Sequence, residues 1–460
     1  MVGWGRMVRK DVPEYPTEPL KCWEEAKALR RKYYEDYLTA HEKGAIRWAG
    51  GAWTFSAIPE GLGDDVYCIT SEPYGATIAF FKEFAMKCQE ATEAAGHARD
   101  LCAYMRNYWG SELRDEYILA DGRIVKGFPL PDFIWQDHIC CSHAKWYQVV
   151  REIAKKKHGR DIPMYCIDVS VGPHVPNLHD ELTDWRLEYV TKQLLDGIEW
   201  LEKVTGRRFD DRRMIDAIYN EMRATSLWAE ICAQNQNVPA PLDEKTMYSL
   251  YVLGTLMKHK KECVEFYEKL LAEVKDRVRR GIAACKHERC RIITDTQPPW
   301  GFLSIFRYLE REYGCVSVGS LYTFGLIGMW EVREDGTLAP KTVPPRSALK
   351  DRETAVRMYA EWTLCRPEWP HFYNPRVKSQ LLIKIARQWK LDGVALHYNR
   401  GCEGLSVHIT MNRLDLIREG IPVMIFEGNM GDEREFDLPR TLARFDMFME
   451  SLGLSKIKRE

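Results

Sequence analysis

Short apolar runs that alternate with amphipathic helix patterns constrain the fold of this chain more than any other feature. The alternation is seen first at residues 131–170, where PDFIWQDHI has a strand pattern, AKWYQVVREIAKKK a helix pattern and IPMYCIDVS a second strand pattern. A strand, a helix and a strand within about forty residues are typical of a βαβ unit, whose two strands are parallel. The sequence therefore predicts a parallel sheet here, with its first strand ending at Cys140.

The same alternation returns after Cys290 and continues almost to the end of the chain. Strand patterns at RIITDT, CVSVGSLY, GVALHYN and IPVMIFE alternate with helix patterns at FLSIFRYLERE, VKSQLLIKIARQWK, a segment through Ile417 and a last segment through Met449. This series predicts a second parallel α/β unit. Ligands of such sheets bind beyond the carboxyl ends of the strands, and both Cys140 and Cys402 follow a predicted strand.

A predominantly helical segment separates the two alternating regions. From position 181 to about 286, apolar residues recur every three or four positions, as an amphipathic helix requires; one such series is Trp185, Val190, Leu194, Ile198 and Leu201. The first hundred residues are also expected to be mainly helical, with long helices at 19–42 and 76–97.

The predicted fold class is α/β, with two parallel-sheet (Rossmann or flavodoxin-like) units and an intervening helical segment. A chain of 460 residues is too long for one ordinary core. We expect an N-terminal helical lead plus the first α/β unit at 1–180, the helical segment at 181–288 and the second α/β unit at 289–460. No internal repeat is visible in the sequence.

Composition excludes several classes of protein. Lys and Arg number 66 against 67 Asp and Glu, a formal net charge of -1, which argues against a nucleic-acid-binding protein because such a protein needs a basic face. No apolar run reaches the roughly 18 residues of a membrane helix, and the N-terminus has no secretory apolar region. We therefore expect a cytoplasmic protein that binds neither membrane nor nucleic acid, and whose 14 cysteines are not structural disulfides.

Nucleotide and compact metal motifs are absent from the sequence. There is no GxxxxGK[ST] and no GxGxxG after a strand, so nucleotide hydrolysis or hydride transfer by this chain alone is disfavoured. No CxxC spacing is present. Most cysteines, among them Cys88, Cys166, Cys232 and Cys263, fit helix or strand patterns as small buried residues.

Three other cysteines lie at positions better suited to binding a ligand: Cys102 in DLCAYMR, Cys140 in DHICCSH and Cys402 in HYNRGCEG. The last two follow strands, where the amides of a following helix N-terminus can face an anionic ligand. An iron–sulfur cluster held by thiolates is such a ligand. Spacing alone leaves this hypothesis open beside simple packing.

Histidines and tryptophans give weaker signals. His143, His397 and His408 are either proton donors or hydrogen-bonded structural histidines. Trp53 and Thr54, in GGAWTFS, either line a pocket or form a buried turn. Spacing decides neither question.

Taken together, these segments resemble the 2-hydroxyacyl-CoA dehydratase and benzoyl-CoA reductase family over about residues 45–452. The matching elements are Trp53–Thr54, DLCAYMR at 100–106, Lys145–Trp146–Tyr147 beginning five residues after Cys140, HYNRGC at 397–402, GIPVMIFEGN at 420–429 and the closing segment FDLPRTLARFDMFME. Each element is weak singly, and together they are specific.

The resemblance implies a 4Fe–4S cluster on Cys102, Cys140 and Cys402, in a cleft between α/β domains close to an acyl-CoA thioester. Within the family the chain looks most like the B/O-type subunit of ATP-dependent (class I) benzoyl-CoA reductase. Such an oxidoreductase delivers low-potential electrons to the ring of an aryl-CoA and yields a cyclic dienoyl-CoA, in anaerobic aromatic degradation. A subunit of a 2-hydroxyacyl-CoA dehydratase is the first alternative, and a non-catalytic scaffold subunit is the second.

The resemblance also implies partners. They are a related cluster-bearing subunit, ATP-hydrolysing electron-activating subunits, ferredoxin as the upstream donor, and benzoyl-CoA or a similar aryl-CoA as substrate. ATP hydrolysis on a companion subunit agrees with the absence of a P-loop in this chain.

Two features depart from the dehydratase pattern. Cys141 directly follows the expected ligand Cys140, and extra residues lie between Gly110 and Pro129. Cys141 is either a fourth iron ligand or a thiol that faces away. Trp53, Thr54 and Trp300 are the candidates for the wall of a dry substrate pocket, with core packing as the alternative.

Overall fold

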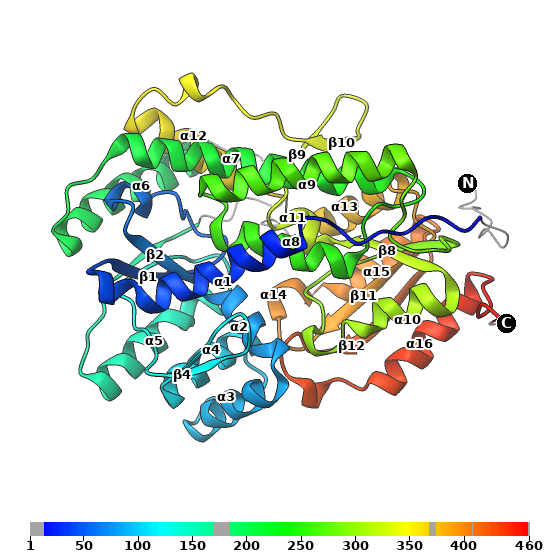
Figure 1. Cartoon of the computed structure of the whole chain (residues 1–460), viewed down its shortest axis with the longest axis horizontal. Coiled ribbons are helices and arrows are strands. Elements are labelled where there is room, and N and C mark those ends of the chain that lie inside the picture. The colour runs from blue at the N-terminus through cyan, green and yellow to red at the C-terminus, as the bar shows by residue number, and fades with distance from the viewer. Residues whose placement is uncertain (1–12, 170–183, 368–373, 407, 459–460) are drawn as a thin grey trace.

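Two parallel sheets of four strands each organise the chain (Figure 1). The computed structural model describes residues 13–169, 184–367, 374–406 and 408–458. The first sheet has the order β2 (Val66–Thr70), β1 (Ile46–Gly50), β5 (Phe133–Asp137) and β6 (Met164–Ile167). The second has the order β12 (Val423–Gly428), β11 (Gly393–Asn399), β7 (Cys290–Thr294) and β8 (Cys315–Ser320). The predicted class, α/β with two parallel-sheet units, is confirmed.

Both sheets share one topology, although the sequence shows no repeat. We number the four strands of each sheet along the chain. The strand order is then 2-1-3-4 in the first sheet and 4-3-1-2 in the second. The second order is the first one read from the opposite edge, so strands 1 and 3 are central in both sheets. In such a doubly wound order the ligand crevice opens at the carboxyl ends of strands 1 and 3, where the connections diverge. These strands are β1 and β5 in the first sheet, and β7 and β11 in the second. The segments that follow these four strands carry the candidate cluster and pocket residues except Cys102.

The N-terminal region is less helical than expected. Helix α1 (Trp23–Thr39) matches the first predicted helix, but the second is broken at Phe81 into α2 (Ser71–Phe80) and α3 (Lys82–Ala94). Strands β1 and β2 also lie in this region. Five residues, IRWAG or VYCIT, are too few for a strand period to be told from a buried helix segment. The region between Gly110 and Pro129 contains an antiparallel hairpin of β3 (Glu116–Ile118) and β4 (Ile124–Lys126).

Four middle helices come after the first sheet and before the second in the sequence, and together they pack on both sheets. They are α6 (Asp184–Thr205), α7 (Asp211–Ala233), α8 (Glu244–Met257) and α9 (Lys261–Arg280), and in Figure 1 α7 and α9 run above the two sheets. The predicted stripe on α6 is buried at Val190, Leu194, Ile198 and Leu201, but Trp185 is 58% exposed. The predicted boundary at 180/181 lies outside the described residues.

The remaining helices cover the sheets and connect their strands. They are α4 (Ala103–Arg114), α5 (His143–His158), α10 (Ser304–Tyr313), α11 (Leu321–Gly325), α12 (Arg352–Leu364), α13 (Pro375–Gln388), α14 (Glu403–Ser406), α15 (Ile409–Arg418) and α16 (Leu438–Ser451), beside a short hairpin of β9 (Trp330–Val332) and β10 (Leu338–Pro340). In the described part of the chain, no helix is long and apolar enough to cross a membrane.

One apolar core extends from the first sheet through the middle helices to the second sheet. Indole N–H groups tie the parts together: Trp228 of α7 donates to the Thr323 carbonyl (2.8 Å) and Trp389 donates to the Cys232 carbonyl (3.1 Å). Cys88, Cys232 and Cys263 are buried as predicted. The prediction for Cys166 was wrong: it lies on β6, at the edge of the first sheet, and is exposed.

Candidate functional site

The three candidate cluster cysteines each precede a helix. Cys102 is the N-cap residue of α4. Cys140 lies three residues beyond β5 and three before α5, because β5 ends at Asp137 rather than at Cys140 as predicted. Cys402 lies three residues beyond β11 and directly before α14. The two sheets therefore contribute one cysteine each from the carboxyl end of strand 3.

These three cysteines come close enough for their thiols to influence one another. The pKa of Cys102 is raised to about 11, mainly by burial and in part by the Cys140 thiol. Burial likewise raises the pKa of Cys402 to about 12, with added contributions from Cys102 and Cys140. Backbone N–H groups of Met105 and Leu405 act in the opposite direction by donating to Cys102 and Cys402, respectively. Segments about 300 residues apart in the sequence thus converge, and a cation would be needed to keep these buried thiols ionised.

The donor set fits an iron–sulfur cluster in its chemistry. Thiolates are the ligands of such clusters, and amide donors beside them stabilise the negative charge. Within the described ranges, no group of three or more His, Cys, Asp or Glu side chains stands in an arrangement that could hold a metal ion. The assignment of Cys102, Cys140 and Cys402 as ligands therefore stays a prediction.

Cys141 lines a hollow of about 370 Å³, and among the described residues Cys102 is the one member of the three candidate cluster cysteines that also contributes to it. This hollow is also lined by Cys102, Trp109, Lys145 and Gly401. Cys141 is exposed, and its Sγ is 3.9 Å from a carboxylate oxygen of Glu403. Burial of the sulfur raises its pKa, and the neighbouring Cys140 and Glu403 add to the effect. Its role as a fourth ligand stays a prediction.

Two of the three candidate pocket residues line one cavity. Trp53 follows β1 and Trp300 follows β7, and they share a cavity with Tyr248, Tyr251 and Tyr322. Phe80, Phe81 and several small residues complete a largely apolar wall. Thr54 is not part of this lining. It is fully buried, and its hydroxyl has no hydrogen-bond partner in the described structure.

Tyr104 lies between this aromatic cavity and the cysteines. Trp300 Nε1 donates a hydrogen bond of 2.5 Å to the Tyr104 hydroxyl, which also bonds with Tyr322. Burial raises the pKa of Tyr104 well above its usual value, and the Cys102 and Cys402 thiols raise it further. Tyr104 was part of the DLCAYMR element, but nothing in that element distinguished it as a site residue.

A buried ionic triad is formed by His143, Glu72 and Asp137, and two of its members lie three residues before and after Cys140. His143 bonds through Nε2 to the Glu72 carboxylate and through Nδ1 to Asp137 at 3.1 Å. Burial lowers the pKa of His143, but the charge of Glu72 and the other anionic partners outweigh it, and the net pKa is raised well above its usual value. His143 is therefore a charged histidine held by two carboxylates. Sequence reasoning missed Glu72, which lies in α2 with no motif around it.

The loop that carries Trp53 is held by buried polar groups. Glu72 accepts a hydrogen bond from the Ala52 N–H at 2.8 Å. Lys258, at the end of α8, donates to the Ala52 carbonyl at 3.0 Å and to the Ser56 hydroxyl at 2.7 Å. Both side chains are almost fully buried. The position of the pocket wall is therefore determined by α2 and α8 and not by the loop alone.

The other two candidate histidines differ from His143. His397 is buried, its Nδ1 is 2.7 Å from the Gln297 carbonyl, and burial lowers its pKa to about 4, so that it is neutral at pH 7. His408 is partly buried with a lowered pKa. Gln297, which follows β7, also donates to the Cys402 sulfur at 3.4 Å. Gln297 thus orients a candidate ligand, and its lack of any motif explains why the sequence did not reveal it.

Comparison with known proteins decides the family. A family model described as 2-hydroxyglutaryl-CoA dehydratase, D-component, matches residues 67–452. The chain belongs to this family.

Curated relatives of this dehydratase family include both reaction types. The chain is 25% identical to the (R)-2-hydroxyisocaproyl-CoA dehydratase alpha subunit of Clostridioides difficile, over 92% of this chain and 93% of that protein. It is 24% identical to the (R)-phenyllactyl-CoA dehydratase alpha subunit of Clostridium sporogenes, over 87% and 88%. It is also 24% identical to a benzoyl-CoA reductase subunit of Thauera aromatica, over 78% of each protein. The resemblance found in the sequence is confirmed for the family, and dehydratases are at least as close as the reductase.

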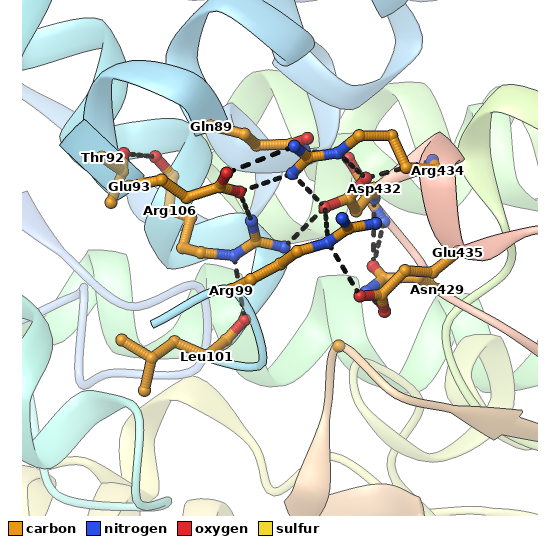
Figure 2. A network of polar contacts seen from close by, with 12 residues as sticks. Gln89, Thr92, Glu93, Arg99, Leu101, Arg106, Asn429, Asp432, Arg434 and Glu435 are labelled. Carbon is orange, nitrogen blue, oxygen red and sulfur yellow. Dashed lines mark hydrogen bonds and ion pairs between the residues drawn. The ribbon is translucent and has the colours of Figure 1, made fainter. Parts of the chain in front are cut away.

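In this dehydratase-family chain, a polar network with Arg106 and Asp432 buried at its centre joins the two halves next to Cys102 (Figure 2). Arg106 of α4 donates to the Leu101 carbonyl (3.2 Å), to Glu93 (3.2 Å) and to Asp432 (3.0 Å). Arg434 donates to the same two carboxylates at 2.6 and 2.7 Å. Leu101 directly precedes Cys102, so this network positions the cysteine relative to the loop after β12.

Proposed function

We propose that this chain is the iron–sulfur subunit of a complex that dehydrates a 2-hydroxyacyl-CoA. The observation that supports this proposal is the convergence of three cysteines beside an aromatic cavity, with Tyr104 between them. The dehydratase alpha subunits among the relatives, which align with nearly the whole chain, favour this reaction over others.

In this proposal Cys102, Cys140 and Cys402 hold a 4Fe–4S cluster. When bound, such a cluster supplies one-electron chemistry at a low potential that side chains cannot supply. The remaining work belongs to the chain itself. The aromatic wall excludes water from the acyl group, which strengthens the electrostatic interactions in the site. The Tyr104 hydroxyl and the Trp300 indole form a polar contact in the wall nearest to the cysteines.

The overall dehydration is redox-neutral. A hydroxyl leaves from carbon 2 and a proton leaves from carbon 3, so the products are an enoyl-CoA and water. Any electron that starts the reaction must be returned at its end. We further propose the partners that the sequence resemblance implied, namely a related cluster-bearing subunit, ATP-hydrolysing electron-activating subunits and ferredoxin. We place the complex in the cytoplasm, where thiols stay reduced.

Reduction of an aryl-CoA is the second candidate function. The cavity favours it because Trp53, Trp300 and three tyrosines offer flat apolar surfaces to an aromatic ring. This reaction adds two electrons and two protons to the ring of benzoyl-CoA or a similar thioester and gives a cyclic dienoyl-CoA. A non-catalytic scaffold subunit is the third candidate.

Two assays under anoxic conditions separate these candidates. The complex reconstituted with its partner and activating subunits is given a 2-hydroxyacyl-CoA or benzoyl-CoA, and the enoyl-CoA or dienoyl-CoA product is measured. Enoyl-CoA formation is the expected result, and dienoyl-CoA formation would assign the chain to the reductases. Iron analysis of the chain purified alone tests the scaffold, which predicts almost no iron.

Cysteine variants test the ligand set. We expect Cys102→Ala, Cys140→Ala and Cys402→Ala each to lose iron and the reduced-state EPR signal, because each removes a thiolate. Cys141→Ser should keep both, and the exposed Cys166→Ser is the matched control. Full iron content in any one of the three alanine variants would disprove that ligand assignment.

A further inference from the structure

Five arginines gather around one hollow in a chain whose net charge is only -1. The hollow has a volume of about 400 Å³ and its cationic lining is Arg99, Arg400, Arg434, Arg440 and Arg444. Three carboxylates, Glu427, Glu435 and Asp437, also line it. The lining therefore has more positive than negative groups, which favours an anionic ligand.

Ion pairs hold three of the five guanidinium groups in place. Arg400 Nε donates to Glu427 at 2.7 Å, Arg99 Nε is 3.3 Å from Glu435, and Arg434 belongs to the network of Figure 2. Groups that are already positioned lose little entropy when a ligand binds.

The other two arginines, Arg440 and Arg444, have guanidinium charges that no carboxylate of the described structure pairs with. Arg440 and Arg444 are four residues apart on α16, so they project from the same face of the helix. In the described part of the structure neither forms an ion pair, and Arg444 donates only to the Ile425 carbonyl, at 3.2 Å. Asp437 forms no ion pair with either guanidinium in the described residues, and its carboxylate caps α16 by accepting the Arg440 backbone N–H.

Neighbouring residues of the chain line the arginine hollow and the hollow that Cys102 lines. Arg99 and Arg400 belong to the first, whereas residues 100–102, Gly401 and Glu403, which closely follow them in the chain, belong to the second. A single elongated ligand lying along these two chain segments would have one end among the arginines and the other end at Cys102.

We infer that the arginine hollow binds the phosphate groups of the substrate's coenzyme A moiety. Guanidinium groups pair with phosphate oxygens through two parallel hydrogen bonds, and a concave cluster of them suits the phosphates of a small molecule. The inference rests on the proposed function, which requires an acyl-CoA substrate. It adds the residues that recognise the nucleotide end, far from the reacting acyl group.

Calorimetric binding to the full-length chain tests this subsite. The probes are S-butyl-CoA, a thioether that cannot react, and S-butyl-pantetheine, which lacks all the phosphates. The proteins are the wild type, the double variant Arg440→Gln/Arg444→Gln, and the control Arg279→Gln, an exposed arginine on α9. We expect the double variant to bind S-butyl-CoA about tenfold more weakly, or about 1.4 kcal/mol. Binding of S-butyl-pantetheine should be unchanged, and the control should match the wild type.

The outcomes distinguish failure of this inference from failure of the proposed function. If the wild type binds S-butyl-CoA and the double variant binds it equally well, the inference is overturned and the proposed function stands. If the wild type binds neither probe, the proposed function itself fails. Should the double variant not fold, the exposed Arg440→Gln alone should still weaken binding about threefold. Normal binding combined with lost electron uptake from the activating subunit would assign the hollow to protein docking and overturn the inference.

Discussion

Arg106 is the residue whose replacement should reveal most about how the two halves of the protein are joined. Its side chain is fully buried and makes three hydrogen bonds, to the Leu101 carbonyl, Glu93 and Asp432. Arg106→Met keeps much of the aliphatic stem and removes all three. Asp432, which is also fully buried, keeps its second partner Arg434.

The expected loss of stability follows from these contacts. Removing one partner of a buried ion pair costs about 3–5 kcal/mol, because the remaining charge is left without compensation. Asp432 is not left alone, since Arg434 still donates to it at 2.7 Å. The lower end of the range therefore applies, and we expect Arg106→Met to lower the free energy of unfolding by about 3 kcal/mol.

Urea unfolding of the wild type and two variants provides the assay. The matched control is Arg99→Gln in the same network, because the Arg99 side chain is 46% exposed and its pair with Glu435 is 3.3 Å long. An exposed pair contributes about 0–1 kcal/mol, so Arg99→Gln should shift the unfolding midpoint little.

The iron content of Arg106→Met is the second measurement. Because Arg106 holds the Leu101 carbonyl, directly before Cys102, we expect the variant to retain less iron than Arg99→Gln after the same anoxic purification. A loss below about 1 kcal/mol, the value of an exposed pair, would refute the view that this network joins the two halves. Full iron retention would refute its role in positioning Cys102.

Three further predictions follow from single contacts. Gly110→Ala should destabilise the protein by several kcal/mol in denaturant unfolding, because a Cβ there would lie 2.0 Å from the Cys88 carbonyl oxygen, where α3 and α4 touch. Burial raises the pKa of Asp432, but hydrogen bonds from its two arginine partners outweigh this and hold the pKa below its usual value. Its contribution to stability is therefore present above about pH 3.9 and lost as the pH falls through the folded-state pKa, so the unfolding free energy of Asp432→Asn should depend less on pH in acid than that of the wild type. Tyr104→Phe leaves the Trp300 indole N–H without its acceptor, so turnover should fall while iron content stays at the wild-type level; equal losses of both would place Tyr104 in the cluster's support instead.

Local patterns predicted most of the helices and the second sheet because those elements are long or strongly apolar. GVALHYN was predicted as a strand with the bounds that β11 has, and the helix beginning near Ala144 corresponds to α5. The first sheet was predicted only in its second half. β1 and β2 are five residues each, and so short a run contains too few alternations to distinguish a strand from a helix.

Residues that act through tertiary contacts could not be predicted in the same way. Glu72, Gln297 and Lys258 lie in ordinary helix or loop sequence, and each matters only because a distant segment brings it to the site. Trp53 and Trp300 were candidates in separate motifs, and their shared cavity depends on how the two sheets are placed. The arginine hollow likewise draws on separate chain segments.

The sequence by itself determined the α/β class, the family and the identity of the candidate cysteines, because these depend on local periodicity and on short motifs. The tertiary structure alone decided that strands 1 and 3 lie at the centre of both sheets, and that Cys140 and Cys402, beyond the carboxyl ends of β5 and β11, come together. It also decided that Cys102 joins them from the start of α4, tied by Arg106 to the other half of the chain. The physical reason is that strand order and domain packing depend on contacts between residues far apart in the chain, which no local pattern records.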